Sequence, residues 1–388
     1  MWYRMKLIYI SHWRFPSEKT MTPLILKTCA HFARLGWEVE LWIPRRSNDY
    51  KAKEDVFELY KISPRFVIRR IACIDTMNFL GTFGFLLMVA TFNLSAFLKL
   101  RNEQTAVLYA HDIRDVILPS LRRLSVFVEI HDFYVSSFDF INRSVFARIT
   151  GLIVTNALKI SRIAERYKFP IDRMLRQPNA VEAKDFDIST SQEDARAQLG
   201  LPHEGEIALY TGHLFGWKGV HTLADAAAFL PANVSILFVG GTTEDRSALQ
   251  TYISEHNLPR ISFVPHQTPD KIPLYQKAAD VLVLPNTAKE EASRIETSPV
   301  KLFEYLASGK PIVASDIPSI RDIVSDKEVF FAKPDDGKNF ALTITEALKG
   351  DQKRSEAARA FAWDHSWESR AEHIDAFMKK RIEITPCK

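Results

Sequence analysis

The chain alternates short runs rich in β-branched and other apolar residues with longer amphipathic segments, and this alternation restricts the possible folds more than any other feature. It is typical of a mostly parallel sheet whose two faces are covered by helices. In the first half, the expected strands are 7–10, 39–43, 107–110, 126–130 and 152–155. The pattern then starts again, with expected strands at 207–210, 235–239, 261–264, 281–284 and 311–314. We therefore expect an α/β protein built from two Rossmann-like domains.

A polar stretch at 183–203, which ends in Gly-Leu-Pro, separates the two sets of strands. We place an N-terminal domain at 1–185 and a C-terminal domain at 186–365. Ligands of open parallel sheets bind outside the carboxyl ends of the strands. We therefore expect the ligand in a cleft where the strand ends of the two domains face each other.

The cysteine content indicates a reducing compartment. Cys29, Cys73 and Cys387 are too few, and too irregularly spaced, for a disulfide framework or a structural zinc site. The apolar run 7–10 is too short for the core of a signal peptide. We expect an unprocessed cytoplasmic protein, with a peripheral position at the inner face of the membrane as a further hypothesis.

Charge is distributed unevenly along the chain. Residues 1–185 carry ten more basic than acidic side chains, whereas the remainder carries six more acidic than basic ones. A basic half suits an anionic membrane or a phosphorylated substrate. The basic residues are scattered rather than clustered, so we expect no nucleic-acid partner.

Segment 76–98 contains no charged residue and is rich in phenylalanine and leucine. A helix of this length could cross a bilayer. Threonine, asparagine and serine interrupt it, and basic residues flank both ends, so no charge bias would orient a span. We favour a helix packed inside the protein, and keep an interfacial helix and a membrane span as alternatives.

The segment 296–311 predicts a short helix with a phosphate-binding start. Ser298 is a suitable N-cap, Pro299 a suitable first helical residue, and Gly309 can end the helix in the left-handed conformation. Such a helix start presents free N–H groups and a partial positive charge. Glu296 and Glu304 flank it. A nucleotide-sugar has a diphosphate for the helix start and hydroxyls for the carboxylates.

A glycine-rich loop at 211–220 indicates the same chemistry. Gly212 lets the backbone approach a ligand closely, and Lys218 supplies a positive charge for a diphosphate. The loop matches neither the dinucleotide nor the Walker fingerprint. Taken alone it is a weak signal.

Together these motifs resemble the retaining GT-B glycosyltransferases of family 4. The similarity rests on Glu296 and Glu304 with seven residues between them, on the Gly-His-Leu-x-x-x-Lys-Gly loop, and on Ser-Trp-Glu-x-Arg at 366–370. It is specific across about 205–375. The resemblance implies two Rossmann-like domains, a donor held mainly by the C-terminal domain, and a final helix at about 366–382 that returns to the N-terminal domain.

Carried over by position, the resemblance implies a role for each motif residue. Glu296 would contact the donor sugar, Glu304 the ribose, and Lys218 the departing diphosphate. The remaining donor-binding residues expected in this domain are Gly212, His213, Thr297, Ser298, Pro299, Val300 and Arg294. In the N-terminal domain the family places a histidine after a strand, pointing at the donor sugar. His111 is our first choice for it and His131 our second.

The sequence also departs from the family's pattern. His213 stands where arginine is common, and Arg294 is the residue that could replace that charge. Thr-Ser-Pro follows Glu296 where many members have Gly-x-Gly, and the loop 16–22 lacks paired glycines. The Asp-Phe-Asp at 185–187 fits a metal-binding pattern of another glycosyltransferase architecture only superficially.

We therefore expect a retaining hexosyltransferase that moves a sugar from a nucleoside-diphosphate sugar to an acceptor hydroxyl, with no cofactor and no essential metal. Expected partners are the donor, a saccharide or lipid-linked acceptor of polysaccharide biosynthesis, and an anionic membrane surface. The alternatives are a non-transferring sugar-nucleotide enzyme, such as a 2-epimerase, and a catalytically silent binding or scaffold subunit.

Overall fold

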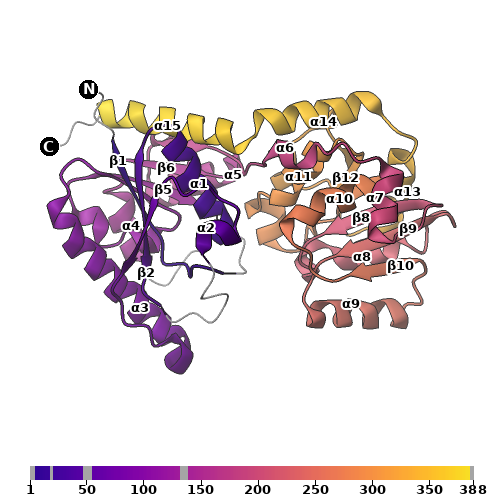
Figure 1. Ribbon diagram of the computed structural model, residues 1–388, viewed down its shortest axis with the longest axis horizontal. Coiled ribbons are helices and arrows are strands. Elements are labelled where there is room, and N and C mark those ends of the chain that lie inside the picture. The colour runs from indigo at the N-terminus through magenta and orange to yellow at the C-terminus, as the bar shows by residue number, and fades with distance from the viewer. Residues whose placement is uncertain (1–4, 18–20, 47–54, 132–138, 385–388) are drawn as a thin grey trace. The chain divides into compact units, whose positions relative to one another are not determined.

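The computed structural model describes residues 5–17, 21–46, 55–131 and 139–384 (Figure 1). Contacts divide the chain into two compact units. The first consists of Met1–Gln177 together with Trp367–Lys388, and the second of Pro178–Ser366. Cys387 and part of the loop 16–22 lie outside the described residues.

The first unit is built on a seven-stranded parallel sheet in the order β3-β2-β1-β4-β5-β6-β7. Its strands are β1 (Lys6–Ile10), β2 (Glu38–Pro44), β3 (Val67–Ile71), β4 (Val107–Ala110), β5 (Ser125–Ile130), β6 (Gly151–Val154) and β7 (Met174–Arg176). Its helices are α1 (Met21–Arg34), α2 (Val56–Leu59), α3 (Met77–Lys99), α4 (Asp139–Phe146), α5 (Ala157–Tyr167) and α15 (Trp367–Ile384).

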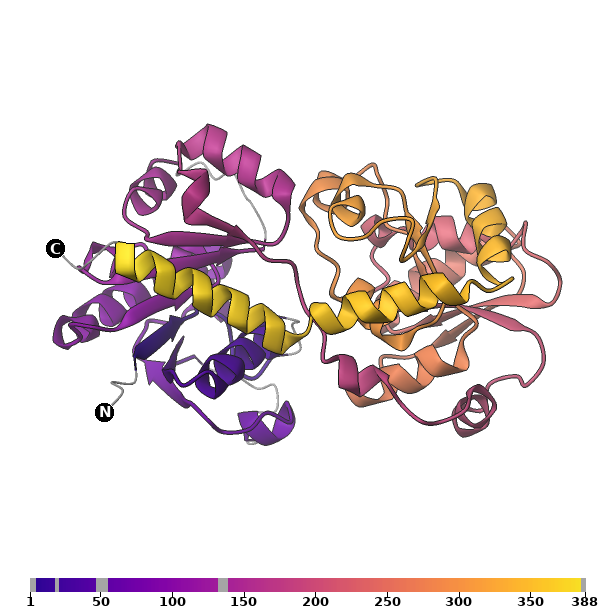
Figure 2. The same cartoon turned by 90° about the horizontal axis from the view of Figure 1, so that it is seen from above.

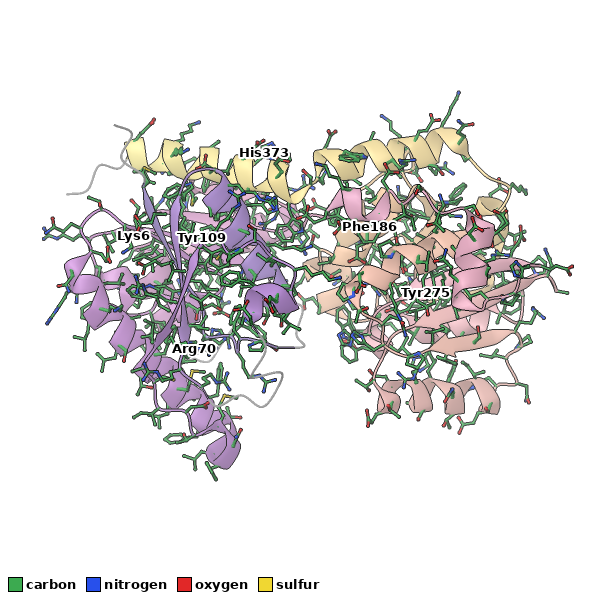
Figure 3. All side chains as sticks on the ribbon, viewed as in Figure 1. Lys6, Arg70, Tyr109, Phe186, Tyr275 and His373 are labelled. Atoms are coloured by element: carbon green, nitrogen blue, oxygen red, sulfur yellow. The ribbon has the colours of Figure 1, made fainter. Side chains whose placement is uncertain are left out.

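Both faces of this sheet are buried, as expected for parallel strands. Ile8 and Ile10 of β1 belong to a core that includes residues of α3, α4 and α5. Leu7 and Tyr9, which alternate with them, belong to a second core with α1 and α15. Tyr109, labelled in Figure 3, lies in this second core and is fully buried.

The second unit is built on a six-stranded parallel sheet in the order β10-β9-β8-β11-β12-β13. Its strands are β8 (Glu206–Thr211), β9 (Val234–Val239), β10 (Ile261–Val264), β11 (Val281–Leu284), β12 (Ile312–Ser315) and β13 (Phe330–Ala332). Its helices are α6 (Ala183–Phe186), α7 (Gln192–Leu199), α8 (Val220–Ala226), α9 (Thr243–Glu255), α10 (Ile272–Ala278), α11 (Val300–Ser308), α12 (Pro318–Arg321), α13 (Gly337–Ala347) and α14 (Gln352–Asp364).

This second sheet is also covered on both faces. Residues of α10, α11 and α14 form a core against one face, and residues of α8, α9 and α13 form a core against the other. Tyr275 of α10 belongs to the first of these cores (Figure 3). The α/β fold class expected from the sequence is therefore confirmed, with two parallel sheets.

All ten expected strands are present, and the structure adds three that the pattern did not predict, namely β3, β7 and β13. Each is the outermost strand of its sheet. The strands β7 and β13 are only three residues long. In β3, Val67 is 52% exposed and two consecutive arginines follow Ile68. Edge strands are often short or carry charged side chains, which keeps them from pairing with another chain. Such strands lack the apolar run by which a buried strand is recognised in a sequence.

The final helix α15 packs within the first unit, along the side of the sheet that carries α1 (Figures 1 and 2). Ile374 and Met378 are fully buried in the core shared with α1. Trp37 donates from Nε1 to Asp375 at 2.7 Å. Residues of the C-terminal helix therefore complete the hydrophobic core of the N-terminal unit.

A buried ion pair attaches α15 to the sheet. Arg370 donates from Nη2 to Oε1 of Glu129, at the end of β5, and both side chains are almost completely buried. Tyr109 donates to Oε2 of the same carboxylate at 2.5 Å. Burial alone would raise the pKa of Glu129, but Arg370 and two neighbouring histidines hold this pKa well below its usual value.

The apolar segment expected as a helix forms α3, with a non-helical residue at Gly81 (φ 49°). Gly84, Met88, Phe92 and similarly spaced residues face the core. The opposite side leaves large apolar side chains in solvent, including Phe79 (88% exposed) and Phe83 (66%). By length and composition the stretch Met77–Asn102 could cross a membrane, which on its own is weak evidence. The packing helix that we favoured is present, but only one of its faces is buried.

We predict that replacing Arg370 with methionine destabilises the first unit by about 3–5 kcal/mol at neutral pH, because Glu129 would keep a buried charge without its strongest partner. Burial would then raise the pKa of Glu129 in the variant, so the loss should shrink as the pH falls and the carboxyl becomes protonated. Urea unfolding at pH 7 and at about pH 5 measures both effects.

Lys379→Met is the matched control, since Lys379 pairs with Asp375 on the exposed side of the same helix. Such surface pairs contribute about 0–1 kcal/mol. A variant at Arg370 that unfolds at the same urea concentration as this control would contradict the structural role of the ion pair.

Candidate functional site

The order of the second sheet reverses between β8 and β11, and the loops that follow these two strands meet there. Gly219 has φ +73°, and a Cβ atom at this position would lie 1.8 Å from the carbonyl oxygen of Pro285. The Thr287 N–H donates to the Trp217 carbonyl at 3.4 Å. Glycine is therefore required where the two loops cross. Ligands of open α/β sheets bind at such a reversal point.

The start of α11 is fixed by the segment that begins the second unit. The backbone N–H of Asn179 donates to Ser298 Oγ at 3.2 Å, and its side-chain Nδ2 donates to the Ser298 carbonyl at 2.6 Å. Ser298 is therefore not the N-cap expected from the sequence, because its hydroxyl is used by Asn179. Pro299 occupies the N-cap position and α11 begins at Val300. Gly309 ends the helix at φ +69°, as expected.

Glu296 ends the π-helical turn η7 (Ala292–Glu296), three residues before the N-cap of α11. The N–H of Thr297 donates to the Ala292 carbonyl at 2.9 Å, so this amide is occupied within the chain. Pro299 has no N–H to offer. Of the expected backbone donors, Val300 lies in the first helical turn, where N–H groups lack intrahelical acceptors. Arg294, the expected replacement for a missing arginine, is exposed in η7.

Glu304 lies within α11 and is partly exposed. Its neighbour Tyr305 is fully buried and attaches the helix to β8, because the hydroxyl of Tyr305 accepts from the Thr211 N–H at 2.9 Å. Tyr305 thereby fixes how α11 lies against the carboxyl end of β8. No feature of the sequence distinguishes this tyrosine from its neighbours.

The glycine-rich loop after β8 carries two expected residues with different surroundings. Lys218 Nζ lies 3.7 Å from the centroid of the Trp217 ring, a favourable cation–π geometry. His213 is exposed and stacks on Phe215. Partial burial, together with positive charge from Lys301, lowers the pKa of His213. His213 is therefore uncharged at neutral pH and does not replace the arginine charge.

Gly212 has φ +116°, a conformation that suits glycine, and its N–H donates to the Val239 carbonyl at 2.8 Å. A Cβ atom here would lie 3.1 Å from the amine of Lys301. The sequence predicts that the backbone at Gly212 approaches a ligand closely. In the structure, the group beside Gly212 is the amine of Lys301. Lys301 was not among the expected site residues, because a lysine in the first turn of an amphipathic helix carries no sequence signal of its own.

The first unit brings its two candidate histidines together. His111 follows β4, His131 follows β5, and their rings stack with centroids 4.1 Å apart. The side chain of His131 hydrogen-bonds through Nε2 to Glu129. The carboxylate that holds Arg370 of α15 therefore also orients the second histidine.

His111 is buried, and its Nδ1 forms a hydrogen bond of 2.9 Å with the Tyr9 hydroxyl. Burial raises the pKa of Tyr9, so its hydroxyl stays protonated and can donate to Nδ1. Burial and the adjacent His131 lower the pKa of His111 well below its usual value. A neutral imidazole that accepts at Nδ1 carries its proton on Nε2. Among the described residues this Nε2 has no hydrogen-bond partner, so it can donate to a ligand oxygen.

His111, Glu129 and His131 also place one possible metal-ligand atom each within 4.8 Å of one another. The donor set is a poor fit for a metal ion. Glu129 already accepts from Arg370 and Tyr109, and a buried guanidinium would repel a cation. The expectation that no essential metal is needed remains a prediction.

Sequence reasoning missed a further pair beside His111. His12 follows β1, is buried, and places Nδ1 2.7 Å from Asp115. Burial opposes charge on His12, but Asp115 outweighs it and raises the pKa of this histidine. Since β1 and β4 are neighbours at the reversal point of the first sheet, a histidine after β1 could have been considered on the same grounds as His111.

The expected site residues thus form two groups, each at the carboxyl ends of central strands. The second unit holds Gly212, His213, Lys218, Arg294, Glu296, Thr297, Ser298, Pro299, Val300 and Glu304. The first unit holds His111 and His131. The Asp-Phe-Asp at 185–187, whose fit to a metal-binding pattern is only superficial, spans the end of α6, where Asp187 pairs with Arg359 at 2.6 Å.

Residues 191–362 match the family model described as Glycosyl transferases group 1. D-inositol 3-phosphate glycosyltransferase of Corynebacterium urealyticum is 26% identical over 239 residues, which cover 58% of this chain and 55% of that protein. The protein of the same name from Mycolicibacterium smegmatis is 29% identical over 200 residues, covering 47% and 43%. The chain spans about half the length of the curated relatives it matches.

Solved structures resemble the chain over almost its full length. Sucrose-phosphate synthase from Thermosynechococcus elongatus aligns with a TM-score of 0.78 at 19% identity, covering 98% of this chain and all of that one. Anabaena Alr3699/HepE in complex with UDP aligns with a TM-score of 0.71 at 17% identity, covering 97% and 100%. Residues 191–362 are therefore similar to the glycosyl transferases group 1 family, and the chain has the GT-B fold.

Proposed function

We propose that the protein is a glycosyltransferase that transfers a sugar from a nucleoside-diphosphate sugar to an acceptor hydroxyl, with retention of anomeric configuration and without an essential metal. One observation carries the proposal. The start of α11, with Glu296 before it and Glu304 within it, adjoins the strand reversal of the matched domain. That is where an α/β sheet binds its ligand.

In this proposal the second unit stabilises the leaving diphosphate. Lys218 and the first N–H groups of α11 would bind phosphate oxygens as negative charge develops on them. Removing one well-placed donor of this kind costs about 3–4 kcal/mol in the transition state. Glu296 would accept from sugar hydroxyls and Glu304 from the ribose. We assign no protein nucleophile.

The first unit contributes a neutral hydrogen-bond donor. The Nε2–H of His111 would donate to a hydroxyl of the donor sugar, while Tyr9 holds the ring through Nδ1. A neutral donor suits an uncharged sugar, because an imidazolium would have to be desolvated when the sugar covers it. The His12 and Asp115 pair lies beside the same strand ends and would contact the acceptor.

Uridine is the first nucleoside to test in the sugar donor. The structural relative HepE was solved in complex with UDP, with UDP and glucose, and with UDP-glucose. Those ligands were bound to HepE, and they make UDP-glucose the first donor to try here.

We further propose that the acceptor is a lipid-linked saccharide at an anionic membrane surface, as needed in polysaccharide biosynthesis. The exposed face of α3 presents Phe79, Phe83 and Leu86, with Arg69 and Arg70 before the helix and Arg101 after it. Apolar side chains bordered by basic ones are typical of proteins that lie on anionic membranes.

A panel of UDP-, GDP-, ADP- and dTDP-sugars should raise the melting temperature for one base only. A ligand at about 100 times its dissociation constant adds roughly 2.7 kcal/mol of apparent stability. Differential scanning fluorimetry measures the shift. If none of these ligands shifts the transition at millimolar concentration, the assignment of a nucleotide-sugar donor is wrong.

Replacing Lys218 with methionine should lower kcat about 10²-fold or more, because the leaving diphosphate loses a positive charge. Glu296→Gln should lower transfer by a comparable factor. The assay is release of nucleoside diphosphate from the donor found above, with and without added acceptor. Release that is equally fast without acceptor would indicate a non-transferring enzyme instead.

Lys333→Met and Glu290→Gln are matched controls, since both side chains are exposed in the second unit. They should retain wild-type rates. If Glu296→Gln also retained full biological activity, the chain would be a silent subunit and not a transferase.

The membrane proposal predicts that the wild-type protein floats with anionic liposomes at low salt and less at high salt. Replacing both Phe79 and Phe83 with serine should abolish flotation, since burying a phenylalanine contributes about 1.5–3 kcal/mol. Phe140→Ser is the matched control, because Phe140 is 68% exposed on α4 of the same unit. Wild-type protein that stays in solution at low salt removes this part of the proposal.

A further inference from the structure

The amine of Lys301 is buried without a hydrogen-bond partner among the described residues. Its stem is partly exposed, but Nζ itself is shielded from solvent. The nearest favourable contact is the Tyr210 ring, whose centroid lies 3.7 Å from Nζ. A buried polar group without a hydrogen bond is unfavourable. This amine therefore gains more than a solvated lysine would from a ligand that offers acceptors.

The position of Lys301 is fixed by the surrounding structure. Tyr305 lies four residues later on the same face of α11, and its hydrogen bond to Thr211 holds this face against β8. The amine is thereby brought to Gly212, where a Cβ atom would lie 3.1 Å from Nζ. Apart from Lys301 and the residues adjoining Gly212, no described atom lies within 4 Å of that Cβ position. Lysine, glycine and helix start thus converge at one point of the strand reversal.

The charges around Lys301 favour an anion. The titratable groups that face it are Tyr210 on β8, His213 and Lys218 in the following loop, and Glu304 and Tyr305 on α11. Lys218 repels a charged amine at Lys301, whereas Glu304 attracts it less strongly. A second cation beside Lys218 is thus unfavourable in the free protein. A ligand with two negative charges removes this repulsion.

We propose that Lys301 is a second cationic contact for the diphosphate, and that its amine takes up a proton from solvent when a nucleoside diphosphate binds. This inference rests on the proposed function and names an additional residue of the same site. A sugar hydroxyl is a poorer match than a phosphate, because it brings no charge to offset the two lysines.

Burial, reinforced by Lys218, lowers the pKa of Lys301 well below that of a free lysine. The amine is therefore protonated less fully in the free protein than a solvated lysine is at the same pH. An anionic oxygen at hydrogen-bond distance raises the pKa again, because it favours the charged form. Binding of a nucleoside diphosphate is therefore accompanied by uptake of a proton at Lys301.

The test uses isothermal titration calorimetry of the full chain at about pH 8.5 in two buffers that differ in ionisation enthalpy. The probes are UDP, GDP, ADP and dTDP, followed by the nucleoside that corresponds to the diphosphate that binds. Lys301→Met is the test variant, because methionine fills the same space and removes an unpaired amine, so the fold should be retained. Lys301→Gln is the second variant, which is polar but cannot be charged.

Lys310→Met is the matched control. Lys310 lies just beyond the other end of α11, is also partly buried, and donates to Gln192 at 2.9 Å. Burial lowers its pKa to about 8. A general effect of removing a partly buried lysine from this unit would therefore appear in this variant as well.

Both Lys301 variants should bind the diphosphate about tenfold more weakly or worse, as expected when a hydrogen bond to a charged group is lost. They should bind the nucleoside as wild type does, and take up fewer protons per diphosphate bound. Lys310→Met should match wild type in all three respects. The inference is overturned if Lys301→Met loses less than about fivefold, if the nucleoside is weakened equally, or if proton uptake is unchanged. If wild type binds none of the four diphosphates, the proposed function itself fails.

Discussion

The attachment of α11 to the end of β8 is the contact on which the proposed site depends. The hydroxyl of Tyr305 accepts a hydrogen bond from the Thr211 N–H, and Asn179 donates two hydrogen bonds to Ser298 just before the helix. At the same point Gly219 lets the loops after β8 and β11 cross. These contacts hold the N-terminal end of a short helix next to a glycine-rich loop. Without them the partial positive charge at the helix start and the two lysines would not converge.

The first unit reaches an equivalent arrangement with different chemistry. Its central strands end in histidines, and the carboxylate of Glu129 orients one of them while it holds Arg370 of the C-terminal helix. The side of the sheet that carries His111 is thus tied to the last helix of the chain. One unit presents positive charge at its strand ends, and the other presents a neutral donor.

Much of the fold could be predicted from the sequence, because buried parallel strands are continuous apolar runs and the chain has ten clear ones. The three missed strands lie at sheet edges, where the residues are few or charged. In the site, the spacing of Glu296 and Glu304 could be recognised from the sequence, but the N-cap of α11 was assigned to Ser298. That error arose because a local rule could not anticipate a hydrogen bond from Asn179, more than a hundred residues away. Lys301 was missed for the same reason, since tertiary contacts alone set it apart. His12 follows a predicted strand and could have been considered on the same grounds as His111.

The central claim is that the entrance to α11 binds a diphosphate. A crystal structure of the protein with the nucleoside diphosphate that binds would test it most directly. The account predicts phosphate oxygens within hydrogen-bond distance of the Val300 N–H and of the amines of Lys218 and Lys301. Phosphates bound elsewhere, with this entrance filled by protein atoms, would contradict it.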